Sequence, residues 1–253
     1  MWNRDHWTKT EYDQFVEYLL TLRDEKFYLF QVKNIPNTGK IIGIRAAMLS
    51  KLAKEIGKGN YEEFLQWIDN EYYEITKISA YLIGFVTNQR PVKEWNVVQG
   101  YLEHFLPYVD NWSTCDTLCE RLKITQLYPQ EMFSFVQLCL DSEQLFTKRF
   151  AYVMLLKYYI QDSYMDFIFQ VCRKNHINEY YVNMAIAWLL SMCYVKYDKQ
   201  TIDFLLNQLD DIGIKRMTFR KILDSFQVSK EEKEMIRMYQ KIELEKTHNV
   251  GIQ

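Results

Sequence analysis

Apolar residues recur at the spacing of an α-helix along almost the whole chain, and few residues interrupt them. The stretch 8–24 follows the i, i+3, i+4, i+7 pattern with Tyr12, Phe15, Val16, Leu19, Leu20 and Leu22. Only 8 glycines and 4 prolines occur among 253 residues, so the turn residues that a β-sandwich needs are scarce. The sequence therefore predicts an all-α protein.

The helical pattern breaks at short polar segments. The clearest predicted loop covers residues 34–39, which contain both Pro and Gly, and a second break falls at 57–60. The predicted helices cover residues 8–24, 41–57, 60–69, 71–87, 93–105, 111–122, 130–140, 143–160, 162–175, 179–195, 199–208, 214–226 and 229–244. Short helices joined by short loops indicate either a solenoid or an irregular bundle.

A repeat of small residues favours the solenoid. Ala80, Cys115, Ala151 and Ala187 follow one another at steps of 35 or 36 residues, a length that two helices and their turns occupy in helical-hairpin repeats. A small side chain at each position fits the close approach of neighbouring helices. Residue identity between the repeats is weak, so a chance alignment is the alternative.

The repeat also predicts which side chains share one surface. The small residues are followed by Tyr81, Asp116, Tyr152 and Trp188, and one turn before these lie Lys77, Trp112, Lys148 and Met184. Residues four apart lie on the same face of a helix. If the second helix of each hairpin lines the solenoid, these side chains form a strip along its inner surface.

The charge balance excludes a basic nucleic-acid-binding arm. The net charge is −2, and neither half of the chain is basic, so a DNA-binding surface must gather its cations locally. Candidate contributors are Lys77, Lys148, Arg149, Lys157, Arg173, Lys174, Lys215, Arg216, Arg220 and Lys221. For most of these the alternative is a solvated face. The start of the chain is polar, unlike a signal peptide, and no apolar run is long enough to predict a membrane span.

The cysteines and histidines do not predict a metal site. The five cysteines include no C-x-x-C pair, and Cys115 and Cys119 are the only two at helical i, i+4 spacing. His6, His104, His176 and His248 are distant from them in the sequence. Small buried thiols in a reducing compartment are therefore the preferred interpretation.

The segment 108–119 combines a carboxylate with an indole. Asp110 or Asn111 is a suitable N-cap, which places Trp112 in the first turn and Asp116 one turn later. The predicted core stripe of this helix is Cys115, Leu118, Cys119 and Leu122, with Asp116 at its edge. The alternative is that Asp116 caps or pairs on a solvated face while Trp112 fills the core.

Two later helices also carry residues that their apolar surroundings do not explain. Lys148 and Arg149 stand near the start of the helix predicted at 143–160, where cations interact unfavourably with the helix dipole. A purely stabilising role is therefore less expected for them. Trp188 lies in the apolar run 185–190, where taken alone it would belong to the core.

Taken in order, these segments resemble the AlkD-type DNA alkylation repair family. The matching runs are N-W-S-T-C-D-T-L-C at 111–119, K-R-F-A-Y-V-M-L-L-K at 148–157 and A-I-A-W-L-L at 185–190. The stretches 43–54 and 220–225 are also similar, and the resemblance covers about residues 10–240. No single motif is diagnostic, but the set of Trp, Asp, Arg and Trp is moderately specific.

The resemblance implies a fold and an activity. The fold would be an all-α solenoid of HEAT-like repeats, one domain over residues 1–253, curved with a concave DNA-binding face. The activity would be that of a monofunctional DNA glycosylase, which excises cationic N-alkylated purines such as 3-methyladenine and 7-methylguanine from duplex DNA. The family is associated with acting on the lesion without drawing it into a deep base pocket. A monomer without cofactor or metal, cytoplasmic and associated with the nucleoid when bound to DNA, is also implied.

The resemblance also implies roles for individual residues. By position, Asp116 matches the catalytic carboxylate, Trp112 and Trp188 match the two site tryptophans, and Arg149 matches the arginine that faces a phosphate. Lys148 is expected to contact DNA beside Arg149.

These residue types suit the chemistry. An alkylated purine already carries a positive charge and leaves without protonation, so the barrier is the positive charge that develops on the sugar. A carboxylate beside the sugar stabilises that charge and orients water. Indole faces attract cations by about 0.5–2 kcal/mol, and an arginine binds a phosphate with two parallel hydrogen bonds.

Two departures and two competing functions qualify the resemblance. The chain is slightly acidic overall, and Ser191 and Met192 stand where charged residues are expected. The main competing function is a non-catalytic repeat protein that binds DNA structures or another protein, since a fold alone does not establish activity. An NTP-using enzyme is disfavoured, because Thr38-Gly39-Lys40 lacks the earlier Gly and the following Ser or Thr of a phosphate-binding loop.

Overall fold

The computed structural model describes residues 1–36, 38–91, 93–175 and 179–250, with the side chains of the last helix placed through residue 243. Helices account for the regular structure of these residues, and an isolated bridge pairs Lys40 with Tyr72. The chain divides into two compact units, Met1–Phe150 and Ala151–Gln253. The predicted all-α helical-repeat class is confirmed.

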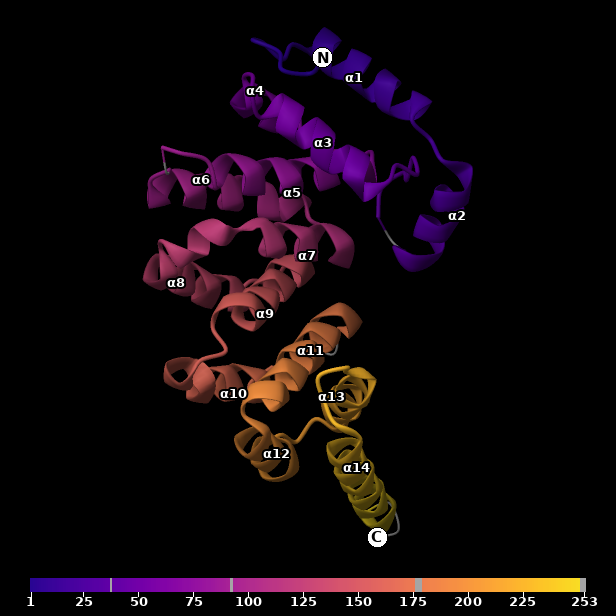
Figure 1. Cartoon of the computed structure of the whole chain (residues 1–253), viewed down its shortest axis with the longest axis vertical. Helices are drawn as coiled ribbons and strands as arrows, with labels where there is room; N and C mark the ends of the chain where they lie inside the picture. The colour runs from indigo at the N-terminus through magenta and orange to yellow at the C-terminus, as the bar shows by residue number, and fades with distance from the viewer. Residues whose placement is uncertain (37, 92, 176–178, 251–253) are drawn as a thin grey trace. The chain divides into compact units, whose positions relative to one another are not determined.

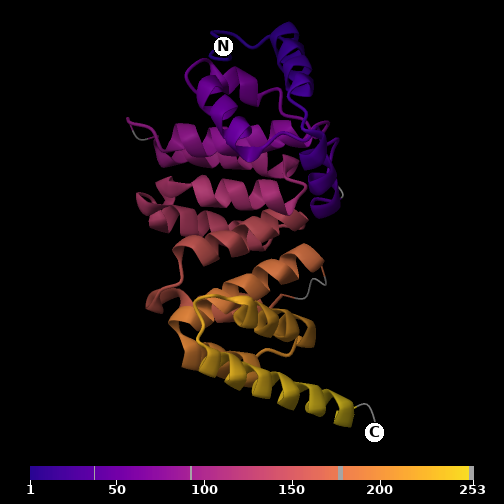
Figure 2. The ribbon, with the colours of Figure 1, turned by 45° about the vertical axis from the view of Figure 1, so that its right-hand side comes forward.

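The first unit is a stack of helices joined by short loops. Its helices are α1 (Lys9–Thr21), α2 (Glu25–Asn34), α3 (Ala46–Ile56), α4 (Tyr61–Leu65), α5 (Tyr73–Thr87), α6 (Trp95–Phe105), α7 (Trp112–Arg121), α8 (Pro129–Leu140) and the start of α9 (Leu145–Tyr158), with two 3-10 turns at Leu106–Tyr108 and Lys123–Gln126. In both views α5 and α6 form one layer and α7 and α8 form the next (Figures 1 and 2). The order of the layers follows the order of the chain.

Helix α5 is the most deeply buried helix of this unit. It packs against α3, α6 and α7, so nearly all of its side chains are buried, including polar ones. At Gly84 a β-carbon would lie 2.2 Å from the β-carbon of Arg121 on α7, so this contact requires glycine. The small residues of the predicted repeat, Ala80, Cys115, Ala151 and Ala187, are all fully buried.

The second unit contains the rest of α9 and the helices that follow. These are a 3-10 turn at Asp162–Tyr164, α10 (Met165–Arg173), α11 (Tyr180–Lys196), α12 (Asp198–Asn207), α13 (Ile212–Asp224) and α14 (Lys230–Val250). Helix α11 packs against α12 and α13, and α13 packs against α14. Tyr152 was predicted on the surface strip, and that prediction is wrong: it is buried, and its hydroxyl donates to the Val171 carbonyl at 3.1 Å.

Helix α2 is the element that the sequence pattern does not predict. Its apolar residues do not form one buried stripe, since Leu29, Phe30 and Val32 are 62%, 60% and 46% exposed. Asp24 caps it by accepting from the Phe27 amide at 3.0 Å. The helices that the pattern does predict are present, with ends that differ by a few residues.

The prediction that a helix starts at residue 41 is wrong, because residues 41–45 have no regular secondary structure and α3 begins at Ala46. Gly43 adopts a positive φ of 101°, which favours glycine. The backbone amides of Ile42, Gly43 and Ile44 all donate to the carboxylate of Glu74, at 2.9, 2.9 and 3.3 Å. Three hydrogen bonds to one fully buried carboxylate thus replace the first helical turn.

Removal of the Glu74 carboxylate should therefore destabilise the first unit. We expect Glu74→Ala to lower the free energy of unfolding by roughly 2–4 kcal/mol, because buried amides without an acceptor are costly. Urea denaturation measures this change. Glu71→Ala is the matched control, since Glu71 is exposed and pairs only with exposed Lys40 among the described ion pairs, a contact worth about 0–1 kcal/mol. Equal losses in the two variants would contradict the assigned role of Glu74.

Candidate functional site

Helix α7 carries the predicted carboxylate and one of the predicted tryptophans. Asn111 is its N-cap, with the side-chain oxygen accepting from the Thr114 amide at 2.8 Å. Asp110 has a different partner: it accepts from the Thr38 hydroxyl at 2.9 Å and from the Gly39 amide at 3.2 Å. The loop that follows α2 is thereby tied to the start of α7.

The two faces of α7 match the prediction. Cys115, Leu118, Cys119 and Leu122 are fully buried, which confirms the core stripe. Trp112 is half-buried, and its indole N–H donates to the Asn34 carbonyl at 3.0 Å. The tryptophan is therefore fixed at the end of α2 and is neither a core wedge nor a free surface group.

Asp116 and Arg149 form a bidentate ion pair between α7 and α9. Arg149 Nε donates to Asp116 Oδ1 at 3.0 Å and Nη2 donates to Oδ2 at 2.9 Å. The Arg149 side chain is 6% exposed and that of Asp116 is 20% exposed. Burial lowers the pKa of Arg149, but the hydrogen bonds and charge of Asp116 outweigh it, so the pKa lies above its usual range.

A second buried cation lies next to this pair. Lys77 on α5 is 5% exposed, and its Nζ donates to the Ser113 carbonyl at 2.5 Å, to Ser113 Oγ at 2.8 Å and to Thr117 Oγ1 at 2.5 Å. Burial lowers its pKa to about 8, and the charge of Asp116 opposes that shift. The prediction that Lys77 belongs to a basic DNA-binding surface is wrong, because its ammonium group is enclosed by α7.

The remaining predicted site residues fall in different places. Lys148 is half-buried near the start of α9, in the first unit. Trp188 lies on α11 in the second unit, where Lys157 Nζ and Lys221 Nζ lie 5.5 and 5.9 Å from its ring centroid. A cationic base at this ring would have to compete with two ammonium groups. The convergence of Trp188 with Trp112, Asp116 and Arg149 stays a prediction.

One more predicted basic contributor is internal. Lys215 is buried in an ion pair with Glu243 at 2.9 Å, so its assignment to an exposed basic run is wrong. A buried ammonium group needs a partner of opposite charge, and the carboxylate of Glu243 supplies it. Arg216 and Arg220 are exposed and line a groove of about 440 Å³ between α13 and α14.

Sequence reasoning missed a small aromatic cavity beside Trp112. The cavity has a volume of about 200 Å³ and lies among α2, α3, α5 and α7. Its lining includes Phe27, Phe30 and Gln31 from α2 and Tyr73 and Lys77 from α5. The apolar periodicity did not predict α2, so it could not place the side chains of this helix. The aromatic residues at 27–30 were the signal in the sequence that could have indicated them.

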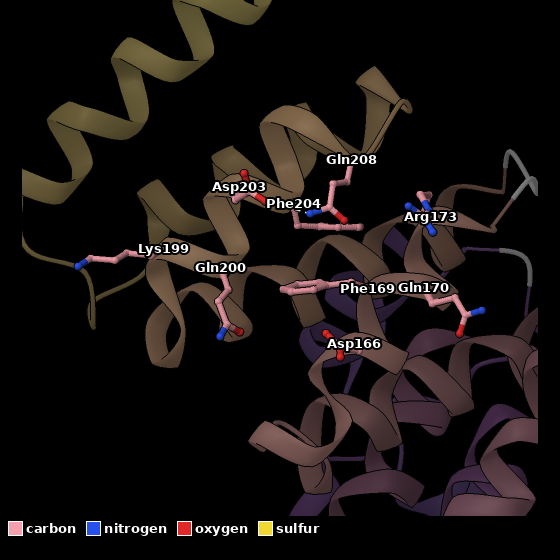
Figure 3. A pocket seen from close by; sticks show the side chains of 9 residues that line it. All are labelled: Asp166, Phe169, Gln170, Arg173, Lys199, Gln200, Asp203, Phe204 and Gln208. Atoms are coloured by element: carbon pink, nitrogen blue, oxygen red, sulfur yellow. Dashed lines mark hydrogen bonds between the residues drawn. The ribbon is translucent and has the colours of Figure 1, made fainter.

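A larger cavity in the second unit is lined by Arg173, one of the predicted basic contributors, and by none of the predicted catalytic residues. It measures about 460 Å³ and lies between α10 and α12. Phe169 and Phe204, which line it, stack on each other with centroids 4.4 Å apart (Figure 3). Asp203 accepts from the Asn207 and Gln208 side-chain amides at 2.8 and 2.9 Å. Its aromatic faces and this carboxylate are thus already engaged within the protein.

The five cysteines are buried and form no disulfide bonds, as expected for small core residues. Within the described part of the chain, no group of three or more His, Cys, Asp and Glu side chains could hold a metal ion. His176 and the side chain of His248 lie outside the described residues. No helix among the described residues is long and apolar enough to cross a membrane.

The stacked helices define a helical-repeat protein, and a comparison with protein families gives its class. The family described as DNA alkylation repair enzyme matches residues 17–237, which is most of the chain. The chain belongs to this family, so it is a DNA repair enzyme whose substrate is DNA. A search among curated proteins found no match.

Lys77 should make stability depend on pH. Between about pH 8 and 10.5 the unfolded chain still binds the proton that folded Lys77 has released. The contribution of this group to the free energy of unfolding therefore rises with pH across that window. The stability of wild type relative to Lys77→Met should increase between pH 7.5 and 9.5, as measured by urea denaturation.

Other titrating groups are common to both proteins and cancel in this difference. Lys51→Met, which changes an exposed lysine of α3, is the matched control. A difference between wild type and Lys77→Met that stays constant with pH would contradict the depressed pKa of Lys77.

Proposed function

We propose that the protein is a monofunctional DNA glycosylase that excises cationic N-alkylated purines, of the 3-methyladenine and 7-methylguanine type, from duplex DNA. Asp116 is the catalytic carboxylate, Trp112 and Trp188 contact the lesion, and Arg149 and Lys148 face the DNA backbone. No cofactor or metal takes part, and the protein acts as a monomer.

The observation that carries this proposal is the setting of Asp116. The carboxylate is partly exposed, lies one turn from Trp112 on α7, and has both oxygens oriented by one guanidinium group. A fixed carboxylate beside an aromatic ring is what a reaction with a cationic leaving group and a cationic sugar requires.

The reaction follows from the charges. The glycosidic C–N bond breaks with both electrons moving to the purine, which becomes neutral, while positive charge develops on the deoxyribose. Asp116 stabilises that charge and orients the water that attacks the sugar carbon. A general acid is unnecessary, because the alkylated base leaves as a neutral group.

Arg149 takes a second role in this proposal. Each Asp116 oxygen accepts one N–H of Arg149, and a carboxylate oxygen has a further acceptor site. Arg149 can thus orient Asp116 while the carboxylate still faces the sugar. A phosphate contact by Arg149 must use other N–H groups of the guanidinium or displace Asp116 from it.

A DNA-binding repeat protein that does not itself release the base is the second candidate. The bidentate pairing of Asp116 with Arg149 favours it, because such a pair is also what a purely structural contact between α7 and α9 would look like. Release of 7-methylguanine from methylated duplex DNA separates the two candidates. Release supports the glycosylase, and binding without release supports the second candidate.

Asp116→Asn tests the catalytic role. The amide keeps the shape but loses the charge, so single-turnover excision should fall by about 10²–10³, the scale of losing one electrostatic stabiliser. The loss should be smaller for lesions that leave readily. Duplex binding should hold or improve, since a negative charge near the phosphates is removed. Excision, binding and Tm are measured on one preparation.

The Asn variant also weakens a buried ion pair, so its Tm should fall. Glu243→Gln is the matched control, because it removes one carboxylate charge from the ion pair with buried Lys215 on α13. Excision should fall in Asp116→Asn far beyond its folded fraction, but not in Glu243→Gln. An Asp116→Asn protein with unchanged excision would remove Asp116 from the mechanism.

DNA binding should depend steeply on salt, because phosphate contacts release counterions. We expect Lys148→Ala to weaken binding to lesioned and normal duplex alike and to reduce the slope of log affinity against log salt by about one. Fluorescence anisotropy over a salt series measures the slope. Lys9→Ala, at an exposed ion pair on α1, is the control, and an equal slope for Lys148→Ala and wild type would reject the phosphate contact.

A further inference from the structure

The turn of α7 that carries Asp116 is held from α5 by one ammonium group. Lys77 Nζ donates to the backbone carbonyl and the hydroxyl of Ser113 and to the hydroxyl of Thr117. Ser113 and Thr117 are four residues apart, so they share one face of the helix, and Asp116 stands between them in the sequence. The three contacts therefore fix the rotation of the turn from which the Asp116 side chain projects.

Packing alone does not account for a lysine at this position. The Lys77 side chain is buried, and all three of its acceptors are neutral oxygens. A buried charge is costly, and apolar residues of similar volume often stabilise a core as well or better. The charge of Asp116 is the largest influence that opposes the lowering of the pKa of Lys77. The ammonium group is thus compensated by the candidate catalytic carboxylate.

The other groups around Lys77 leave Asp116 as its main counter-charge. Cys115 and Glu120, also on α7, act on the ammonium group more weakly. The helices α3 and α6 pack against α5 with buried faces that are apolar. Asp116 therefore interacts with two buried cations, with Lys77 from α5 and with Arg149 from α9.

The two cations differ in what duplex DNA would do to them. In the proposed reaction Arg149 serves both Asp116 and a phosphate, so its hold on the carboxylate weakens when substrate binds. Lys77 is enclosed by α7 and its three N–H groups are engaged with Ser113 and Thr117. It cannot reach a phosphate, so its contacts stay the same with and without DNA.

We propose that Lys77 is a positioning residue for catalysis, which holds the Asp116 carboxylate toward the sugar through Ser113 and Thr117 while Arg149 is drawn to a phosphate. This inference rests on the proposed glycosylase function. It adds to that function a residue that touches neither the lesion nor the DNA backbone.

The first test separates the rate of excision from the affinity for duplex. In Lys77→Met, single-turnover release of 7-methylguanine from methylated duplex should fall by about 10–100-fold at pH 7, the cost of a misplacement of up to about 1 Å. The Kd for duplex should stay within about twofold of wild type, because Lys77 makes no phosphate contact. Thr117→Val keeps the ammonium group and removes one acceptor, so excision should fall in the same direction by a smaller factor.

Thr87→Val is the matched control for these two variants. Thr87 is a buried residue of α5 whose hydroxyl donates to the Ile83 carbonyl in the same helix. Its loss removes a buried hydrogen bond of α5 without touching α7. Excision by the folded fraction of Thr87→Val should equal that of wild type.

The second test is the pH dependence of the ratio between the excision rates of wild type and Lys77→Met. The pKa of Lys77 is about 8, so above that pH its hydrogen bonds lose the charge that makes them roughly twice as strong as neutral ones. The ratio should therefore shrink between pH 7 and 9.5. The stability of wild type relative to Lys77→Met rises over the same range, so unfolding of the variant would make the ratio grow instead.

A signal of the DNA-free protein separates this proposal from the glycosylase function. Arg149 Nε–H donates to Asp116 Oδ1, so its resonance in a ¹H–¹⁵N NMR spectrum reports on the orientation of the carboxylate. Its absence from the spectrum of Arg149→Lys identifies it. The resonance should move in Lys77→Met, and in wild type between pH 7 and 9.5, but not in Thr87→Val.

An unmoved resonance in Lys77→Met, a ratio of rates that is constant with pH, or excision that falls only with the folded fraction would each overturn the role of Lys77. Excision by wild type with any of these outcomes leaves the glycosylase standing. Absence of excision by wild type rejects the glycosylase, and the resonance of Arg149 then decides whether Lys77 positions Asp116.

Discussion

Two buried cations in the first unit find their partners on α7, and the candidate site depends on this arrangement. Lys77 on α5 donates to Ser113 and Thr117, and Arg149 on α9 binds Asp116. An unpaired cation at either position would be very costly. The hydrogen bonds therefore fix the register of α5, α7 and α9 more strictly than apolar contacts do, because apolar packing has no direction. Asp116 keeps its orientation as a consequence of that register.

Sequence periodicity predicted most helices because their apolar stripes match the surfaces that they bury. It failed where local chemistry replaced the stripe. Helix α2 leaves Leu29 and Phe30 in solvent, so its pattern resembles neither a buried helix nor a loop. In the segment before α3, three backbone amides donate to the carboxylate of Glu74, which lies about thirty residues later in the chain. A contact at that separation leaves no periodic signal in either segment.

The candidate site was predictable in its residue types but not in its pairings. Asp116 and Trp112 were identified from one helix, because residues four apart share a face. The phosphate contact of Arg149 stays a prediction, and the pairing of Arg149 with Asp116 across two helices was not predicted. Trp188 was predicted to meet a cationic lesion, and its ring has Lys157 and Lys221 near it. Such pairings depend on how neighbouring helices are rotated, which a single sequence does not encode locally.

The positions of the charges suggest how binding and catalysis would be connected in the proposed reaction. In the proposed reaction, positive charge moves from the alkylated purine to the sugar. An enzyme therefore lowers the barrier if it stabilises positive charge on the sugar more than positive charge on the purine. Lys77 lines the cavity beside Trp112, and Asp116 lies one turn along α7. The ammonium group of Lys77 donates to Ser113 and Thr117, which lie on either side of Asp116 in the sequence of α7, so both buried cations act on this carboxylate. Arg149 also neutralises part of the charge of Asp116. A DNA phosphate that binds the same guanidinium group would weaken this pairing and would make the potential at the carboxylate more negative when substrate is bound. The ion pair between Asp116 and Arg149 would then stabilise the free protein. Binding of duplex DNA would make the negative charge of Asp116 available to stabilise the cationic sugar.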